Sequence, residues 1–333
     1  MDTMSEELNY YAKEEISNSD LGELKVSPRR FMMRKQHEVN TKKSAAMELG
    51  SLIHGFALEP DKYIMADIAP VTGKMGEYIK AYFQLEKVGT PEDRLSSMAY
   101  EMAGYKPSHS KPETILKSFK TKEENIAFYN FLKEADTKIP LAPKDRQIIE
   151  GCLTSLKGHV VSNKLLFSEP MENENIEAFN EREVYFTQHD VECKSKLDRV
   201  IVNHDTKTVT IADIKTTSTQ VYGECKKLKS KTGLLFRDWH TTGFLFNCLQ
   251  YGYYRQLAFY MNAAIAEYPD YSVEAFIVAV DTKGSYDVAV YQLPEEWIKE
   301  GNKEIKTLLS ELNHYKETNN WNVKKGYEEA VTY

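Results

Sequence analysis

The sequence predicts an α/β or α+β fold, in which helices flank a central, mostly antiparallel sheet. Two observations support this prediction. Most of the β-type pattern lies between residues 183 and 215, where apolar and polar residues alternate between turn signals. Amphipathic patterns of helical period precede and follow this region, and the longest spans residues 244–268. Helix and strand patterns in this order are typical of a layered α/β or α+β domain.

The first part of the chain is expected to be helical. Residues 1–16 form an acidic helical lead-in, and a Ser-Asn-Ser run then caps a short helix that ends at Pro28. The segment "KKSAAMELGSLIHGFALEP" has helical apolar spacing up to Pro60. Residues 61–145 alternate polar loops with helical pieces, which indicates a largely helical insertion or elaboration.

Strands are expected mainly in the second half of the chain. They combine apolar alternation with bounding turn residues, and they cover residues 181–188, 191–202, 208–215, 274–281 and 286–293. A basic, polar loop is expected over residues 216–240, and an amphipathic helix over 294–317 closes the pattern. No linker or internal repeat divides the chain, so residues 1–333 are predicted to form a single domain.

Composition excludes several classes of protein. The 333 residues carry a net charge of −7, and 28% are charged, which suits a soluble globular protein rather than one that coats nucleic acid. The acidic first residues are not typical of a secretory signal, and no apolar run is long enough to span a membrane. The four cysteines have no Cys-x-x-Cys spacing, so a cytoplasmic protein with reduced thiols and no zinc site is expected.

The hairpin "KSKLDRVIVNHDTKTVTIADIKTT" contains an unusual pair of carboxylates. If its turn is centred between Asp205 and Thr206, residues whose numbers sum to 411 face each other, and Asp198 opposes Asp213. Alternation places Lys215 on the same face as Asp213. Two opposed carboxylates repel each other unless a cation lies between them, and Mg2+ is commonly held by one or two carboxylates. A cross-strand salt-bridge network is the alternative.

Two basic segments are candidates for phosphate contact. One is "KVSPRRFMMRKQ", which contains Arg29 and Arg30. The other is "KKLKSK", which contains Lys226, Lys227 and Lys229. For each segment taken alone, an ordinary solvated surface is the favoured interpretation.

An ordered set of motifs resembles a known family. The set comprises His54 in "LGSLIHGFALEP", Glu183 in "EREV", Asp198 in "KLDRV", Asp213-Ile214-Lys215 in "ADIKTT", and Gln256-x-x-x-Tyr260 in "YRQLAFY". It is similar to the RecB-like branch of the PD-(D/E)xK nucleases, and more narrowly to phage-type exonuclease VIII nuclease domains. The likeness covers nearly the whole chain. It implies a restriction-endonuclease-like core with a central mixed β-sheet flanked by helices.

The resemblance implies a role for each matched residue. His54, Asp198, Asp213 and the carbonyl of Ile214 would hold Mg2+ or Mn2+, and Lys215 would orient or activate the attacking water. Other roles remain open, because His54 can be a core histidine, Glu183 a strand-edge carboxylate, and Gln256 and Tyr260 part of an aromatic core stripe rather than DNA contacts. Some relatives bind an iron–sulfur cluster on four cysteines, but the cysteines here are spaced differently, and no cluster is expected.

The resemblance also implies an activity and partners. The expected activity is a metal-dependent exonuclease that digests double-stranded DNA from its ends, in the 5′-to-3′ direction, for phage-type recombination. The expected partners are a single-strand annealing recombinase and further copies of the chain in a ring, in the cytoplasm of a bacterial host that carries the phage or prophage. The alternatives are a structure-specific endonuclease of the same superfamily and an inactive DNA-binding protein.

Overall fold

The computed structural model describes residues 10, 13–36, 44–66, 68–106, 108, 110–134, 138–169, 175–229 and 235–327. The chain divides into two compact units. We call Pro60–Glu150 the helical unit, and Glu6–Glu59 together with Gly151–Tyr333 the sheet unit. Most of the predicted lead-in, residues 1–9 and 11–12, lies outside the described residues.

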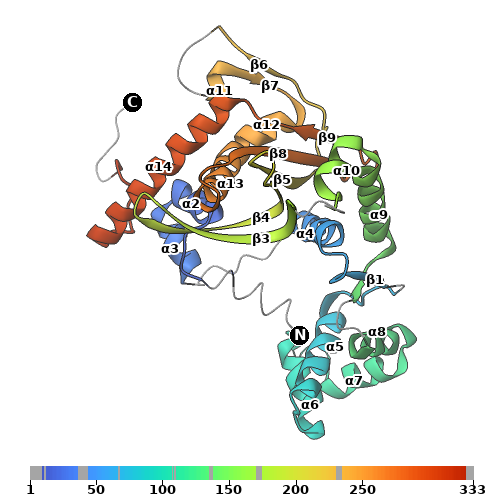
Figure 1. Cartoon of the computed structure of the whole chain (residues 1–333). Helices are drawn as coiled ribbons and strands as arrows, with labels where there is room; N and C mark the ends of the chain where they lie inside the picture. The colour runs from blue at the N-terminus through green and yellow to red at the C-terminus, as the bar shows by residue number, and fades with distance from the viewer. Residues whose placement is uncertain are drawn as a thin grey trace. The chain divides into compact units, whose positions relative to one another are not determined.

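The sheet unit contains a five-stranded mixed sheet with the order β3-β4-β5-β8-β9 (Figure 1). Its strands are β3 (Ile176–Gln188), β4 (Val191–Asn203), β5 (Thr208–Thr217), β8 (Ser272–Asp281) and β9 (Val288–Tyr291). Strands β5 and β8 run parallel, and the other neighbouring pairs are antiparallel. This confirms the predicted α/β class with a central mixed sheet flanked by helices.

The register of the central hairpin agrees with the turn that the sequence indicates. Arg199 pairs with Ala212 and Val200 with Ile211, so opposed residue numbers sum to 411. Strand β5 is central, and its side chains are buried on both faces from Ile211 to Ile214. A central strand that is covered on both faces cannot leave a carboxylate in bulk water, so Asp213 is forced into the interior.

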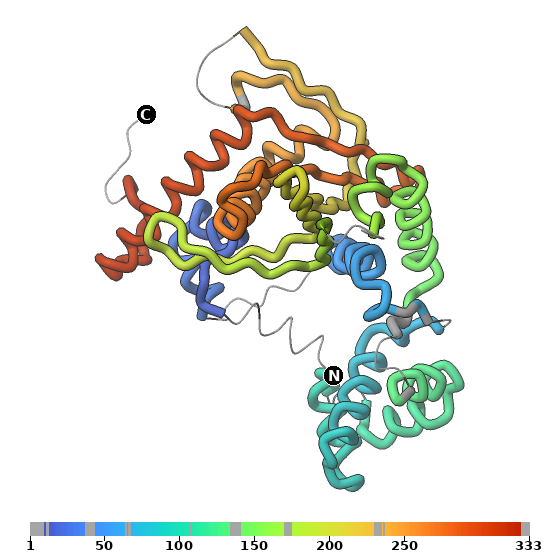
Figure 2. The backbone as a smooth tube through the Cα atoms, in the orientation of Figure 1, coloured from blue at the N-terminus to red at the C-terminus, as the bar shows by residue number. Residues whose placement is uncertain are grey.

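Helices cover the sheet in layers. Helix α13 (Tyr253–Glu267) lies across β3, β4, β5 and β8, and α14 (Glu295–Thr318) and α2 (Asn18–Val26) pack against α13. Figure 2 shows the long β3–β4 hairpin running past α13. Helix α4 (Ala45–Leu58) contacts β4 and β5, and α10 (Val160–Leu166), which follows α9 (Pro143–Gly158), contacts β9. The core between these layers is a continuous set of aliphatic and aromatic side chains.

Two expectations differ from the structure between residues 216 and 268. The expected loop contains a small antiparallel pair, β6 (Cys225–Lys227) and β7 (Trp239–Thr241), and the short α11 (Leu235–Asp238) lies between these two strands in the chain. The expected long helix is two helices, because Gly252 adopts φ 71° between α12 (Gly243–Gln250) and α13. A left-handed residue cannot continue a right-handed helix, so the chain turns at this glycine.

The N-terminal caps explain the start of the sheet unit. Ser17 and Asp20 form a capping box at the start of α2, with Ser17 Oγ 3.2 Å from the Asp20 amide nitrogen and Asp20 Oδ2 2.9 Å from the Ser17 nitrogen. Ser27 ends α2 and caps α3 (Pro28–Lys35), in which Pro28 takes the first helical position. Pro28 therefore begins a second helix directly after the one it was expected to end.

The helical unit has a core of its own. Helices α5 (Gly73–Lys87), α6 (Glu92–Met102), α7 (Pro112–Thr121) and α8 (Glu123–Glu134) enclose a cluster rich in aromatic rings. Within it, the rings of Phe119, Tyr82 and Tyr129 contact one another, with centroid distances of 5.2 Å from Phe119 to each tyrosine and 6.0 Å between the tyrosines. The short strands β1 (Ile64–Ala66) and β2 (Lys138–Pro140) pair in parallel at the two ends of this segment. The predicted helical insertion, residues 61–145, thus folds around a separate hydrophobic cluster.

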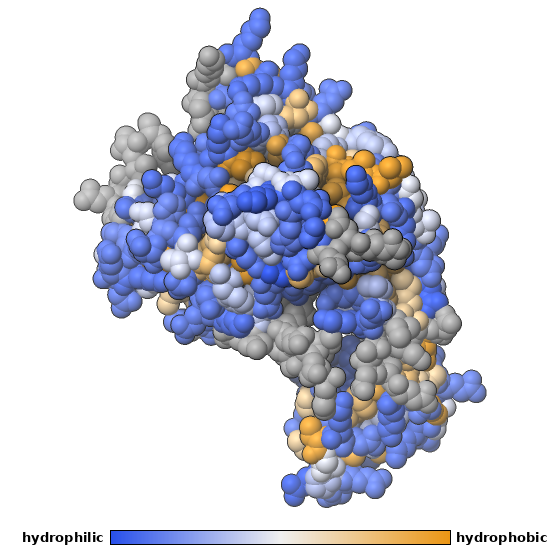
Figure 3. Space-filling view, in the orientation of Figure 1, coloured by the Kyte–Doolittle hydropathy of each residue, from blue (hydrophilic) through white to orange (hydrophobic). Residues whose placement is uncertain are grey.

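The face of the molecule that is drawn in Figure 3 is mainly hydrophilic, and hydrophobic residues gather on it in limited patches. One exposed apolar pair is Val160 and Val161 at the start of α10, which are 82% and 47% exposed. Among the described residues, no helix is both long enough and apolar enough to cross a membrane.

Candidate metal centre

The side chains of the candidate site come from one helix and three adjacent strands. His54 is on α4, Glu181 on β3, Asp198 on β4, and Asp213 and Lys215 are on β5. Helix α4 approaches β5 closely at Gly50, where a Cβ atom would lie only 2.9 Å from Thr216 Oγ1. His54 follows Gly50 by four residues, on the same helix face, so the glycine allows the imidazole to reach the strands.

Three possible metal ligands converge at this point. One ligand atom from each of His54, Glu181 and Asp198 lies within 4.8 Å of the other two. His54 Nδ1 is 3.3 Å from Asp198 Oδ2. Ligands that share one Mg2+ ion lie roughly 3–4 Å apart, because each is about 2.1 Å from the ion. The His54–Asp198 distance lies in this range, and the 4.8 Å limit for the whole group is slightly wider, so small side-chain shifts would bring all three ligands onto one ion. The group includes Glu181, which no sequence motif indicated.

Glu181 owes its position to an unusual backbone conformation. Its φ angle is 51°, which is uncommon for a residue other than glycine. The pairs on either side, Asn180 with Arg199 and Arg182 with Leu197, keep the same register, so Glu181 faces Asp198 without an inserted residue. Its carboxylate is 2.9 Å from Lys196 Nζ.

Glu183, the predicted acidic position, lies outside this group. It pairs in the ladder with Lys196, and its carboxylate accepts a hydrogen bond from the Tyr185 hydroxyl at 2.5 Å. Lys13 Nζ is 3.7 Å from the same carboxylate. The structure thus brings Glu181, two residues earlier on the strand, to Asp198 and gives Glu183 other partners.

Asp213 and Lys215 form a buried ion pair beside the metal group. Lys215 Nζ is 2.5 Å from Asp213 Oδ2, and Asp213 is only 1% exposed. Oδ1 of Asp213 has no hydrogen-bond partner among the described residues. Burial raises the pKa of Asp213 to about 6, the Lys215 ammonium opposes that shift, and the Asp198 charge adds to it. An unpartnered buried oxygen next to a second carboxylate is a suitable position for a cation ligand.

The other carboxylates are also poorly stabilised without a cation. Burial raises the pKa of Asp198, although the Lys215 ammonium and the Ile214 amide oppose this. Burial, followed by the Asp198 charge, raises the pKa of Glu181. Burial and the Lys215 charge lower the pKa of His54, which keeps the imidazole neutral at pH 7, as a metal ligand must be. The donor set of one imidazole and hard carboxylate oxygens therefore fits Mg2+ or Mn2+.

Ile214 and Lys215 contribute in further ways. The Ile214 amide donates a hydrogen bond to Asp198 Oδ2 at 2.8 Å, and the backbone of Ile214 is also a hydrogen-bond partner of His54. The resemblance predicts a metal-binding role for the Ile214 carbonyl, and this remains a prediction. Although burial lowers the pKa of Lys215, the charges of Asp213 and Asp198 raise it above its usual value overall. Lys215 is therefore an ammonium in the metal-free protein.

Gln256 and Tyr260 support the site from α13. Gln256 Nε2 donates to the Tyr260 hydroxyl at 2.7 Å. Tyr260 is 9% exposed, and its pKa is raised well above the usual value by burial and by the charges of Asp213 and Asp198. Tyr260 is thus a buried residue close enough to be affected by the charges of both carboxylates, whereas DNA contact by Gln256 or Tyr260 remains a prediction.

The predicted basic segments are exposed. Lys226 and Lys227 are on β6 and Lys229 follows it, and Lys227 pairs with Glu296 at 2.8 Å. Arg29 and Arg30 are exposed on α3, where Arg30 pairs with Glu23 at 3.0 Å.

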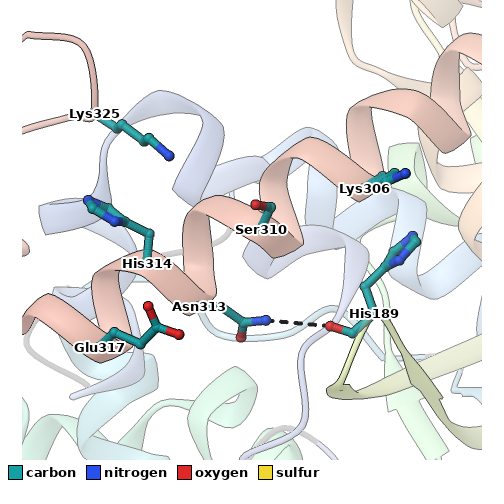
Figure 4. Close-up of a pocket in the computed structure, with 7 residues that line it drawn as sticks. All are labelled: His189, Lys306, Ser310, Asn313, His314, Glu317 and Lys325. Carbon is teal, nitrogen blue, oxygen red and sulfur yellow. Dashed lines mark hydrogen bonds between the residues drawn. The ribbon is translucent and has the colours of Figure 1, made fainter.

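A polar groove of about 340 Å³ lies elsewhere on the sheet unit (Figure 4). It is formed by the β3–β4 turn, α14 and the segment that follows α14, and its lining is His189, Lys306, Ser310, Asn313, His314, Glu317 and Lys325. His189 is eight residues beyond Glu181 along β3, which corresponds to roughly 26 Å of strand. The groove is therefore separate from the metal centre.

The sequence of residues 17–331 matches the family described as a PDDEXK-like domain of unknown function, DUF3799. The chain belongs to this PDDEXK-like family. The match covers nearly the whole chain, including all the residues of the candidate metal centre, and it confirms the resemblance to PD-(D/E)xK nucleases.

A solved structure has the same fold. The crystal structure of a "Putative exonuclease" from Eubacterium rectale matches with a TM-score of 0.54 and 10% sequence identity, and the match covers all of this chain and 95% of the other. At this identity, the likeness establishes the fold alone. A search of curated proteins finds no match.

Proposed function

We propose that the protein is a Mg2+- or Mn2+-dependent exonuclease that hydrolyses double-stranded DNA from its ends. The observation that carries the proposal is the placement of Asp198, Asp213 and Lys215 on adjacent buried strands, with His54 and Glu181 beside them. The PDDEXK-like family supports a nuclease acting on DNA, and the name of the E. rectale protein supports action from ends.

Each side chain has a distinct role in this proposal. His54, Glu181 and Asp198 would hold the ion, and Asp213 would offer its Oδ1 atom to the same region. A divalent ion at such a site makes a bound water more acidic and offsets the charge that develops on the phosphate. Lys215 holds the attacking water or a phosphate oxygen through its ammonium group, and its pair with Asp213 fixes its position.

The finer features of the proposal rest on the resemblance to exonuclease VIII. They are 5′-to-3′ polarity and the production of 3′ single strands for an annealing recombinase in phage-type recombination in the bacterial cytoplasm. A ring of several chains would encircle the DNA and prevent it from dissociating. This would explain how a protein of net charge −7 remains bound to a polyanion. A strictly monomeric protein that is still processive, by light scattering and digestion kinetics, contradicts the ring.

Digestion of linear, nicked and closed circular duplexes with Mg2+ or Mn2+ tests the activity. We expect loss of linear DNA only, with early release of a 5′ end label. Cutting of closed circles would instead indicate an endonuclease. Binding without cleavage of any substrate would indicate an inactive DNA-binding protein. Early release of a 3′ label would show that digestion runs in the 3′-to-5′ direction. The matched control is Lys215→Met, which removes the ammonium group but keeps most of the side-chain volume.

A further inference from the structure

An aromatic pair begins directly beside the candidate catalytic lysine. Lys215 Nζ lies over the ring of Tyr253, 5.2 Å from its centroid. The ring of Tyr251 is 5.9 Å from that of Tyr253 and is tilted by 42° to it. Tyr253 is partly buried, whereas Tyr251 is 60% exposed. A row of two tyrosines therefore leads from the reacting centre to the surface.

The backbone at Gly252 creates this row. Residues two apart on a continuous helix do not face each other. Gly252 has φ 71° and separates α12 from α13, so the flanking tyrosines come together. An added Cβ atom at Gly252 would meet only ordinary contacts at 3.6 Å, so the backbone angle rather than crowding favours glycine here.

The inner tyrosine rests on a fixed aromatic support. The Phe244 ring is 6.0 Å from that of Tyr253 and stacks on Tyr291 at 5.9 Å. The Tyr291 hydroxyl donates to the Val221 carbonyl at 2.6 Å and accepts from the Gly223 amide at 3.0 Å. These contacts hold the aromatic row against the segment that follows β5.

Helix α12 is also tied to the end of the catalytic strand. Asn247 Nδ2 donates to Thr219 Oγ1 at 2.8 Å, four residues after Lys215. A Cβ atom at Gly243 would lie 2.2 Å from the Tyr222 carbonyl oxygen, so the same segment lies directly on the start of α12. Tyr251 is thus a surface residue with a fixed position relative to Lys215, which is the condition for a preorganised binding subsite.

We propose that Tyr251 and Tyr253 form a stacking site for an unpaired nucleobase next to the scissile phosphate. The proposal rests on the proposed nuclease function and adds that the enzyme takes a splayed, single-stranded end into its site. An exposed aromatic ring accepts any of the four bases, because each base has a π face. The pair would therefore bind DNA ends of any nucleotide sequence, and its stacking would favour the state in which the terminal base pair is separated.

A binding experiment in EDTA tests the stacking without requiring cleavage. The probe is a single-stranded oligonucleotide with a terminal 2-aminopurine, whose fluorescence falls when the base stacks. We expect Tyr251→Ala to weaken binding roughly tenfold and to abolish the quenching, and Tyr251→Phe to retain both. Tyr327→Ala is the matched control, because Tyr327 is 55% exposed on the C-terminal segment. Unchanged binding and quenching in Tyr251→Ala, or equal losses in Tyr327→Ala, would overturn the proposal.

A cleavage experiment tests the consequence for the substrate. The wild type should digest a duplex with a mismatched terminal pair faster than a fully paired one, and Tyr251→Ala should lose this preference. An equal preference in both proteins would count against the stacking site. If the wild type cleaves neither substrate, the nuclease function fails, and the fluorescence experiment still decides whether the tyrosines bind a base.

Discussion

Asp198 and Ile214 are joined by a hydrogen bond across two neighbouring strands, from the Ile214 amide to Asp198 Oδ2 at 2.8 Å. Ile214 lies between Asp213 and Lys215, so this bond ties the carboxylate of β4 to the motif of β5. It uses one lone pair of Asp198 and leaves the carboxylate oriented toward His54. The spacing of the candidate ligands is thus set by backbone pairing, which is more rigid than contacts between flexible side chains.

The change Asp213→Asn should abolish cleavage without destabilising the metal-free fold. Burial disfavours the charged form of Asp213, so removing that charge relieves a cost that offsets the lost pair with Lys215. We expect equal or higher melting temperature without metal, and loss of most of the stabilisation that Mn2+ gives to the folded state. Thermal melts with and without Mn2+ measure both effects. A variant that is strongly destabilised without metal would support a plain salt-bridge network instead.

Lys215→Met should show the opposite pattern. The substitution leaves Asp213 and Asp198 buried without their ammonium partner, so the metal-free protein should be less stable. Stabilisation by Mn2+ should be kept or increased, because the ion then replaces the positive charge that Lys215 supplied to Asp213 and Asp198. Cleavage should be lost. The same series of melts, combined with a digestion assay, checks the three outcomes, and loss of the Mn2+ response would show that Lys215 is needed for metal binding itself.

Glu181 and Glu183 provide a matched pair on one strand. Glu181→Gln removes a charge from the converging group and should raise the Mn2+ concentration needed for half-maximal activity by at least about tenfold. Glu183→Gln changes a carboxylate that is hydrogen-bonded to the Tyr185 hydroxyl, and it should leave this Mn2+ concentration nearly unchanged. Metal titrations of activity distinguish the two. Equal effects of the two substitutions would mean that Glu181 is not a ligand.

The sequence contains enough information to predict the sheet and the register of its central hairpin. A tight turn with alternating apolar residues on either side allows only one register that buries the apolar face, which is why Asp198 and Asp213 could be paired from the sequence. The site residues on β5 and α4 follow a fixed spacing within single elements. Their placement in space agrees with the expectation that they converge, although their chemical roles are still predictions.

Glu181 was missed because alternation cannot distinguish it from Glu183, which lies on the same face of the strand. A further signal was present in the two-residue turn at His189 and Asp190, where both φ angles are positive. That turn pairs Gln188 with Val191, and the same register places Glu181 opposite Asp198. The left-handed angle at Glu181 itself is a tertiary effect that no local pattern indicates.

The helical unit and the β6–β7 pair were harder to predict for another reason. Helices of 10 to 15 residues with mixed polarity bury a face only against one another, so their assembly around Phe119 has no local signature. Strands β6 and β7 contain three residues each, and the basic residues of β6 dominate the pattern there. Gly252 was hidden inside a long apolar run, where a single glycine is tolerated in a helix.

Glu304→Gln should destabilise the sheet unit in a pH-dependent way. Glu304 pairs with Arg255 at 2.5 Å and Lys25 at 2.8 Å and accepts from the Tyr254 hydroxyl at 2.5 Å. Burial raises its pKa, but the hydrogen bonds from Lys25 and Tyr254 and the Arg255 charge lower it below 4.5 overall. We expect the free energy of unfolding to fall by about 3 kcal/mol at pH 7, because the buried Arg255 guanidinium loses the negative charge that compensates its own.

The sign of the pH dependence follows from the lowered pKa. The stabilisation by Glu304 is complete above its unfolded pKa and is lost as the pH falls through its lower folded pKa. The difference between wild type and Glu304→Gln should therefore shrink below about pH 4.5, as measured by urea denaturation from pH 3 to 7. Glu300→Gln on the same helix is the control, because the Glu300–Lys303 pair spans 3.6 Å and Glu300 is 34% exposed. A difference that stays constant with pH would assign the loss to packing.

The basic residues after β5 should contribute to DNA affinity and not to chemistry. Neutralising Lys226, Lys227 and Lys229 together to Gln should weaken DNA binding and make it less sensitive to salt, because fewer counterions are released on binding. Lys227 is already paired with Glu296, so we count two lost phosphate contacts rather than three. At roughly 0.9 per contact, the slope of log K against log salt concentration should become shallower by about 1.8. The single-turnover cleavage rate at saturating enzyme should change little, because these side chains are exposed, whereas the reacting groups are buried.

The control for this triple variant is Lys306→Gln with Lys325→Gln, which removes two lysines from the polar groove that is separate from the metal centre. Both variants remove positive charges from the surface, so a general electrostatic effect would weaken DNA binding in both. A specific path for the DNA backbone predicts a lower salt slope in the triple variant alone. If the slopes of the two variants fall equally, long-range charge explains the binding, and if neither falls, Lys226–Lys229 are an ordinary solvated surface.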